Sequence, residues 1–246
     1  MRIGVITVKG PDFHPNARLI EAARERGHEL SLINPYQAVP VLDQGYFSMM
    51  GATPLPHVIL PRQGSPMGEY GFVILNQFQA LGVPLVSGIR GVAIARNQYI
   101  TLQALASSGI QVPRSCFITK PRAFFSAVKH LGGYPVVAKS VDGMGGEGVA
   151  RIDTDDQGQA FLEAGLRPEK GLVVQEFFPP GDRTDLRILV MGNGVAGAMA
   201  LTPAEDDFRS NVHQQGRAEA AALPRDLEKM ALDAARACFL DIAGVD

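Results

Sequence analysis

The sequence predicts a mixed fold, α/β in its first part and α+β in the rest, and two patterns lead to this prediction. In the first ninety residues, short apolar runs typical of strands alternate with helical patterns, at 2–8, 17–29, 30–33, 57–62, 71–82 and 83–87. This alternation predicts a small open parallel sheet with covering helices. Beyond residue 135, strand-like runs follow one another directly, which predicts antiparallel hairpins and a two-layer α+β region.

The later elements each have their own sequence signal. Helices are expected at 97–109, 121–133, 159–165 and 224–241, and strands at 135–141, 149–152, 171–178 and, as a hairpin, 185–201. The helix at 121–133 has a proline at its start and glycines at its end, as helix termini favour. The last helix is expected to bury one apolar face, made of Leu227, Met230, Ala231, Ala234 and Cys238.

Composition excludes several classes of protein. With 23 basic and 25 acidic residues the net charge is -2, so no polybasic field favours direct contact with nucleic acid. Cys116 and Cys238 lie far apart and without histidine neighbours, which argues against a disulfide framework or structural zinc. No signal-peptide pattern and no apolar run of roughly 20 residues occurs, so we expect a cytoplasmic protein that does not enter a membrane.

Gly143, Gly145 and Gly148 have the G-x-G-x-x-G spacing of a dinucleotide-binding turn, but their flanks differ from it. Such a turn needs a helix directly after the last glycine, because the free N–H groups of the helix N-terminus hold the pyrophosphate. Here one strand precedes the glycines and another follows at 149–152. A glycine-rich hairpin can instead lie over the phosphates of a nucleotide, although the companion motifs of protein kinases and the phosphate loop G-x-x-x-x-G-K-[ST] are absent.

Lys139 and Glu176 each allow a binding role and an ordinary structural one. Lys139 ends an apolar strand directly before the glycines, where its ammonium would meet the phosphates; alternatively, it reaches for water. Gln175, Glu176 and Phe177 end a buried strand before two prolines, and exposed backbone at such a bend can contact an adenine edge. The alternative is that Glu176 is a solvated strand end, and periodicity does not separate the two.

Polar residues in the C-terminal part leave similar alternatives open. Asp185 and Arg187 lie on one face of a strand, where a cross-strand ion pair is the ordinary explanation and a ligand role is the other. Arg209, Ser210 and Asn211 belong to a polar loop, and a guanidinium there suits phosphate or carboxylate recognition. The sequence shows no evident set of serine, histidine and aspartate, so it does not indicate a covalent mechanism.

These segments, in this order, resemble the ATP-grasp ligases, and most closely the RimK branch of ATP-dependent glutamate ligases. The most specific parts of the resemblance are KSVDGMGGEGV at 139–149 and FRSN at 208–211. It implies an ATP-grasp fold with an N-terminal Rossmann-like, pre-ATP-grasp domain at 1–92. It also implies a central subdomain with a glycine-rich lid at 93–172 and a C-terminal subdomain at 173–246, whose end is expected to be incomplete.

The same resemblance assigns roles to individual residues. Lys139 would hold the nucleotide phosphates, and Glu176 with Phe177 would form the adenine hinge. Asp185 would lie at the nucleotide site, and Asp246 would be the first magnesium ligand. The remaining assigned residues are those of the lid, Gly143, Gly145, Gly146 and Gly148, and those of the loop at the nucleotide and the reacting group, Arg209, Ser210 and Asn211, of which Arg209 and Asn211 would be catalytic.

The chemistry of the family would make this protein an enzyme that uses ATP and Mg²⁺, or Mn²⁺, to form an amide. A substrate carboxylate attacks the γ-phosphoryl group to give an acyl phosphate, and an amine then displaces phosphate. In the RimK branch the amine is glutamate, and the acceptor is the C-terminal tail of a peptide or a ribosomal protein. By analogy we also expect a homo-oligomer.

Three departures from the family pattern weaken these assignments, and the first two support an alternative, a catalytically impaired nucleotide-binding or scaffold protein. Gln98 stands where these ligases carry a second phosphate-binding lysine, and Ala200-Leu201-Thr202 stands where they have an acidic residue and arginines. A strand with the E-x-N metal ligands would follow Asp246, so the sequence is expected to be a fragment. Each lost charged contact would weaken nucleotide binding about tenfold or more, since such contacts contribute on the order of 1.5 to 3 kcal/mol.

Overall fold

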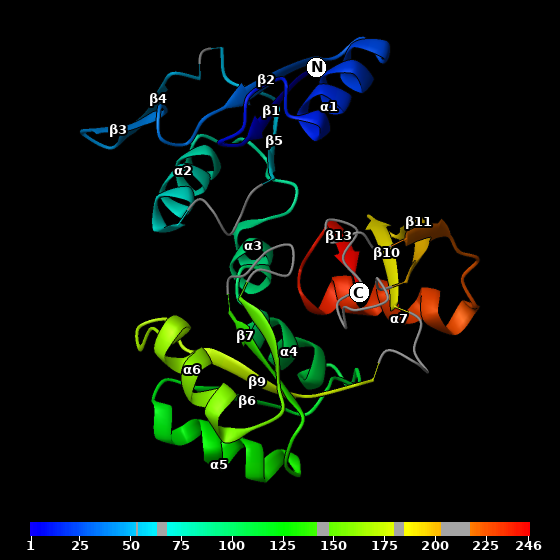
Figure 1. Ribbon diagram of the computed structural model, residues 1–246. Helices are drawn as coiled ribbons and strands as arrows, with labels where there is room; N and C mark the ends of the chain where they lie inside the picture. Colours follow the sequence, from blue (N-terminus) through cyan, green and yellow to red (C-terminus); the bar gives the residue numbers. More distant parts are fainter. Residues whose placement is uncertain (53, 63–67, 142–147, 180–184, 203–216) are drawn as a thin grey trace. The chain divides into compact units, whose positions relative to one another are not determined.

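The fold is that of a computed structural model, in which residues 1–52, 54–62, 68–141, 148–179, 185–202 and 217–246 are described (Figure 1). The chain divides into two compact units, one of Met1–Ala95 with Phe239–Ile242 and one of Arg96–Cys238 with Ala243–Asp246. A boundary between central and C-terminal subdomains at 172–173 would fall inside the second unit, and it stays a prediction. Among the described helices, none is long and apolar enough to cross a bilayer.

A parallel sheet of order β2-β1-β5 forms the centre of the first unit, as the alternating pattern predicts. Its elements are β1 (Arg2–Ile6), α1 (His14–Glu25), β2 (Glu29–Ile33), β5 (Val58–Pro61), α2 (Gly68–Ala80) and α3 (Ile89–Ala95). Helix α2 buries Ile74 and Phe78 in one cluster with Ile6, Ile33 and Ile59 of the three strands. Helix α1 packs against β2. The apolar runs of the sequence therefore form the core of this unit.

The first unit also differs from the sequence prediction. Strands β3 (Val39–Asp43) and β4 (Tyr46–Met50) form an antiparallel hairpin that extends from the sheet (Figure 1) and was not predicted, and α3 was not predicted either. Gln44 and Gly45 both have positive φ, 44° and 89°, which suits a two-residue hairpin turn. The strand expected at 83–87 is reduced to one parallel bridge between Leu85 and Ile59, and Pro84 has no N–H to extend the pairing.

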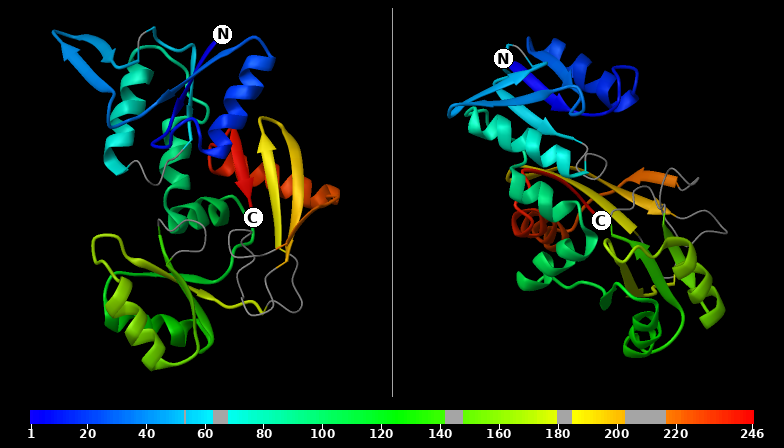
Figure 2. Two further views of the ribbon diagram at one scale, coloured as in Figure 1. Left: turned by 45° about the horizontal axis from the view of Figure 1, so that its top comes forward. Right: turned by 90° about the vertical axis from the view of Figure 1, so that its left-hand side faces the viewer.

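An antiparallel sheet of order β6-β9-β7-β8 dominates the first part of the second unit. Its elements are α4 (Gln98–Ser107), β6 (Ser115–Ile118), α5 (Pro121–Leu131), β7 (Val136–Ser140), β8 (Val149–Ile152), α6 (Asp155–Gly165) and β9 (Leu172–Glu176). Helices α5 and α6 cover one face (Figures 1 and 2). On this face Phe124 and Leu162 pack with Val136 and Val174. Side chains alternate along strands, so Lys139 belongs to the other face.

A second four-stranded sheet, of order β12-β11-β10-β13, belongs to this unit, and its β10–β11 and β11–β12 pairs are antiparallel. Its elements are β10 (Asp185–Met191), β11 (Gly194–Thr202), β12 (Arg217–Ala220), α7 (Arg225–Ala237) and β13 (Ile242–Val245). Helix α7 packs on β10 and β11 and buries Ala231, Ala234 and Ala235. The predicted face was wrong at Met230, which is 46% exposed, because it lies at the border of the i, i+3, i+4 stripe of alanines.

Candidate functional site

Lys139 and Gln175 meet on one face of the β6-β9-β7-β8 sheet, which we call the central sheet. Helices α5 and α6 cover its other face. Strands β7 and β9 pair with Lys139 opposite Val173 and Val137 opposite Gln175, so the two polar residues are diagonal neighbours on one face. Lys139 Nζ donates a hydrogen bond to Gln175 Oε1 at 2.6 Å. The lysine is therefore part of a contact across the sheet and does not simply extend into water.

The two ends of the glycine-rich segment are joined by backbone hydrogen bonds. Ser140 N donates to Gly148 O at 2.9 Å, and Gly148 has a φ of 67°, which favours glycine at this position. Gln98 N donates to Val141 O at 3.0 Å, which places the first turn of α4 beside the end of β7. Asn97 caps this helix, because its Oδ1 accepts from the backbone N–H groups of Tyr99 and Ile100. Gln98 thus lies beside the strand that carries Lys139.

Glu176 ends β9 and is held by Arg114. Its Oε1 accepts from Arg114 N at 2.7 Å, its Oε2 accepts from Arg114 Nε at 2.8 Å, and its own N donates to Arg114 O. The backbone N–H of Arg114, followed by its guanidinium, lowers the pKa of the Glu176 carboxyl below its ordinary value. Glu176 is therefore not a merely solvated strand end. The ring of Phe177 lies 4.6 Å from the guanidinium carbon of Arg151.

This carboxylate predicts a dependence of stability on pH. Because the folded pKa is lowered, the contribution of Glu176 is present above its unfolded pKa, about 4.3, and is lost as pH falls through the folded value. We expect Glu176→Gln to flatten the fall in unfolding free energy on acidification, measured by urea denaturation at a series of pH values. Glu169→Gln, at an exposed position, is the control. Equal slopes for wild type and Glu176→Gln would contradict this prediction.

On the C-terminal sheet, Arg187 and Asp246 form a bidentate ion pair. Arg187 Nε donates to Asp246 Oδ1 and Nη2 donates to Oδ2, each at 2.6 Å. These hydrogen bonds raise the pKa of the Arg187 guanidinium. The cross-strand ion pair expected on this face thus exists, with Asp246 as the acid. Asp185 starts β10 opposite Leu201, and Leu201 is only 4% exposed.

Residues that could hold a metal are not clustered in the described ranges. No group of three or more histidine, cysteine, aspartate or glutamate residues is gathered there. Magnesium is commonly held by one or two carboxylates together with phosphate oxygens and water, so a single carboxylate such as Asp246 fits a nucleotide-bound ion. Both of its oxygens accept from Arg187, so a metal bound to Asp246 would have to share the carboxylate with the guanidinium.

Some of the assigned residues lie outside the described ranges, namely Gly143, Gly145, Gly146, Arg209, Ser210 and Asn211. Sequence reasoning missed Arg114 and Ser115 as partners of Glu176 and Gln175. Alternation along the strand at 171–178 places Gln175 on the opposite face from Glu176, but only the pairing of β6 with β9 shows what each side chain meets.

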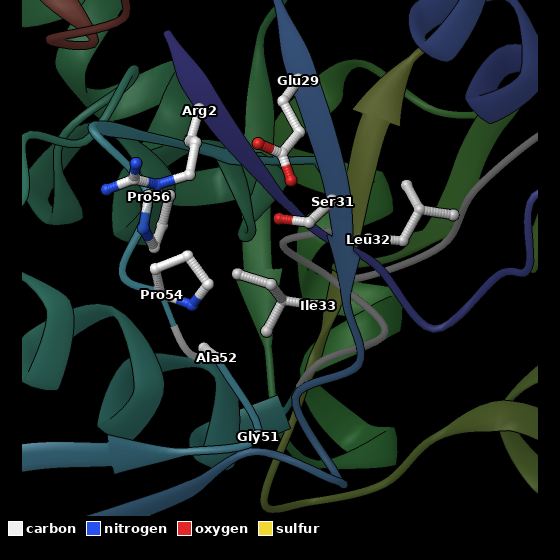
Figure 3. A pocket seen from close by; sticks show the side chains of 9 residues that line it. All are labelled: Arg2, Glu29, Ser31, Leu32, Ile33, Gly51, Ala52, Pro54 and Pro56. Carbon is white, nitrogen blue, oxygen red and sulfur yellow. The ribbon is translucent and has the colours of Figure 1, made fainter.

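A small pocket lies in the first unit, along β2 from Glu29 to Ile33 and beside Arg2 at the start of β1. It has a volume of about 150 Å³, and Figure 3 shows the side chains of Arg2, Glu29 and Ser31 lining it together with Pro54 and Pro56. Its lining residues all belong to the first unit, whereas Lys139 belongs to the second.

Solved structures identify the class of protein that this fold defines. The RimK domain ATP-grasp protein from Sphaerobacter thermophilus is 22% identical, with a TM-score of 0.72 over 100% of this chain and 86% of its own. The ATP-grasp ligase PsnB, solved with minimal precursor, Mg and ADP, is 18% identical, with a TM-score of 0.69 over 100% of this chain and 83% of its own. At these identities the likeness shows the fold, and the fold is that of the ATP-grasp ligases.

The family models and the curated relatives are more specific than the likeness of fold. A RimK PreATP-grasp domain matches residues 1–92, and a RimK-like ATP-grasp domain matches residues 95–246. The probable alpha-L-glutamate ligase 2 of Shewanella frigidimarina is 34% identical over 100% of this chain and 83% of its own length. This chain therefore belongs to the RimK-like ATP-grasp family of ligases, as its sequence motifs predict.

Proposed function

We propose that this protein uses ATP to join glutamate to the C-terminal carboxylate of a peptide or protein, such as the tail of a ribosomal protein. The observation that carries the proposal is the Lys139 ammonium, held by Gln175 at the end of β7, directly before the glycine-rich segment. The similarity to a protein named as a probable alpha-L-glutamate ligase supports glutamate as the amine. A cytoplasmic homo-oligomer is part of the same proposal.

The proposed reaction has two steps, and in each step one bond forms and one bond breaks. An oxygen of the acceptor carboxylate attacks the γ-phosphorus of ATP, the bond to ADP breaks, and an acyl phosphate forms. The glutamate nitrogen then attacks the acyl carbon, the bond to phosphate breaks, and the amine proton leaves with phosphate or water. Neither step needs a covalent nucleophile of the protein, because alignment and charge stabilisation lower both barriers. A bound Mg²⁺ would supply further charge neutralisation on the phosphates.

The roles proposed for residues follow this chemistry. Lys139 contacts the phosphates, Glu176 and Phe177 form the adenine hinge, and Asp185 lies at the nucleotide. Asp246 is the proposed metal ligand. For the lid and the reactive loop the assignment rests on sequence, and the residues are Gly143, Gly145, Gly146, Gly148, Arg209, Ser210 and Asn211.

The first test is the loss of nucleotide binding on removal of the lysine. We expect Lys139→Ala to weaken Mg-ADP binding at least about tenfold in calorimetric titration, because a charge-assisted contact contributes on the order of 1.5 to 3 kcal/mol. Lys129→Ala, at an exposed position of α5, should leave the affinity unchanged. ADP release by the wild type should require both glutamate and an acceptor peptide. Release that ignores every amino acid would count against the proposal.

A second candidate is a nucleotide-binding protein without ligase turnover. Gln98 and Leu201 favour it, since both are uncharged at positions where related ligases carry cations, and Leu201 is buried. ADP binding by the wild type without amide formation from any amine and acceptor would support this candidate. A gain of turnover in Gln98→Lys, which adds a cation beside the end of β7, would show that the missing charge limits the reaction.

A further inference from the structure

A chain of three hydrogen bonds crosses the central sheet and ends at Lys139. Lys139 Nζ donates to Gln175 Oε1 at 2.6 Å, Gln175 Nε2 donates to Ser115 Oγ at 2.8 Å, and Ser115 Oγ contacts Pro113 O at 2.8 Å. Strands β7, β9 and β6 contribute one side chain each. Gln175 is only 7% exposed, in the interior of this chain of contacts.

The carbonyl oxygen of Pro113 fixes the direction of these hydrogen bonds. A carbonyl oxygen can only accept, so the Ser115 hydroxyl must donate to Pro113 O, and its lone pairs remain for the amide nitrogen of Gln175. The amide of Gln175 therefore presents its oxygen to Lys139. The other orientation of the amide would place two donors, the amide NH₂ and the ammonium, against each other.

We propose that Gln175 is a positioning residue for nucleotide binding, which fixes the Lys139 ammonium without cancelling its charge. This inference rests on the proposed function, in which Lys139 contacts the phosphates. A neutral amide oxygen restricts the side chain and, unlike a carboxylate, does not itself neutralise the ammonium. A carboxylate in the same place would pair with the ammonium and would itself repel phosphate. An apolar side chain would remove this hydrogen bond, and the rotamer freedom that the lysine gains would have to be lost when the nucleotide binds.

Two substitutions separate these effects. We expect Gln175→Met, which keeps the length of the side chain, to weaken ADP binding about threefold to tenfold in calorimetric titration. Gln175→Glu, which keeps its shape, should weaken ADP binding more than Gln175→Met does. Adenosine has no phosphates, so its affinity should be unchanged in both variants. A general loss of packing would weaken adenosine and ADP alike, and that result would overturn the inference.

The first unit offers a matched control. Gln77 is also a buried glutamine with two hydrogen bonds, from its Nε2 to Val41 O and Ser48 O. Gln77→Met loses a comparable buried amide in the other unit, and we expect it to leave ADP affinity unchanged. If Gln175→Met does not fold, Ser115→Ala tests the same chain of contacts, because it removes the group that orients the amide, and it should weaken ADP binding but not adenosine binding.

A double-mutant cycle with Lys139→Met tests whether Gln175 acts through the lysine. We expect Gln175→Met to have no further effect on ADP affinity once Lys139 is methionine. If Lys139→Met weakens ADP binding but Gln175→Met does not, or if the effect of Gln175→Met persists without the lysine, the positioning role is wrong and the nucleotide site stands. If Lys139→Met itself leaves ADP binding unchanged, the proposed nucleotide site is wrong, and the positioning role falls with it.

Discussion

Phe124→Ala should lower the unfolding free energy of the second unit by about 3–5 kcal/mol, as removal of a large core aromatic does. Phe124 lies on α5 with no exposed surface, and it packs with Leu162, Val136 and Val174 between the helices and the central sheet. Truncation removes its buried area and leaves a cavity that this sheet cannot close. Urea denaturation followed by circular dichroism measures the loss. Phe178→Ala, at a half-exposed position, should change stability far less.

The packing around Phe124 gives this prediction a second, independent check. A Cβ placed on Gly158 of α6 would lie 2.5 Å from Phe124 Cε1, so the helix approaches the ring through a glycine. We expect Gly158→Ala alone to destabilise the protein by about 1–3 kcal/mol through overpacking. In the Phe124→Ala background the same change should be neutral or stabilising, because space is available and alanine favours helix. Strictly additive effects would contradict direct packing of these two residues.

Sequence patterns predicted the elements that bury a regular face. The parallel strands and α1 follow from apolar period, and α5 follows from Pro121 at its start and Gly132 at its end, where the glycine has a φ of 104°. The β3–β4 hairpin was missed because it buries little: Leu42 and Tyr46 are exposed on it, so no alternation marks its strands. Pro40 also argues against a strand unless that strand lies at an edge, as β3 does.

The sequence predicted candidate site residues only where the residues next to them in the sequence mark them. Lys139 was selected as a candidate because it directly precedes the glycine-rich segment, and Glu176 because it ends a buried run before prolines; their binding roles stay predictions. Their partners were not found, since Arg114 is 62 positions from Glu176, and Ser115 is 60 positions from Gln175. Strand pairing brings them together, and one sequence does not determine the order of strands in a sheet. An ion pair was expected for Arg187 on its face of the strand. Its partner, Asp246, is identified only by the pairing of β10 with β13.

Asp246→Asn should lower turnover about 10³-fold or more if the carboxylate is a metal ligand, because a catalytic metal contributes several kcal/mol and each 1.36 kcal/mol is tenfold in rate. Asparagine keeps the size of the side chain but removes its charge. The ion pair with Arg187 has both side chains about half exposed, so its loss should change the unfolding free energy by less than about 1 kcal/mol. Dependence of ADP release and of ADP binding on Mg²⁺ concentration is the measurement.

Two further variants decide what the ion pair itself does. Asp233→Asn makes the same chemical change at a carboxylate of α7 that pairs with Lys229 and Arg236, and turnover should not respond. Arg187→Met frees both oxygens of Asp246, and we expect Mg²⁺ to bind severalfold more tightly in the presence of ADP, because no cation competes for the carboxylate. Weaker Mg²⁺ binding would mean that the guanidinium orients the carboxylate for the metal. Unchanged turnover in Asp246→Asn would leave the ion pair as the whole role of this residue.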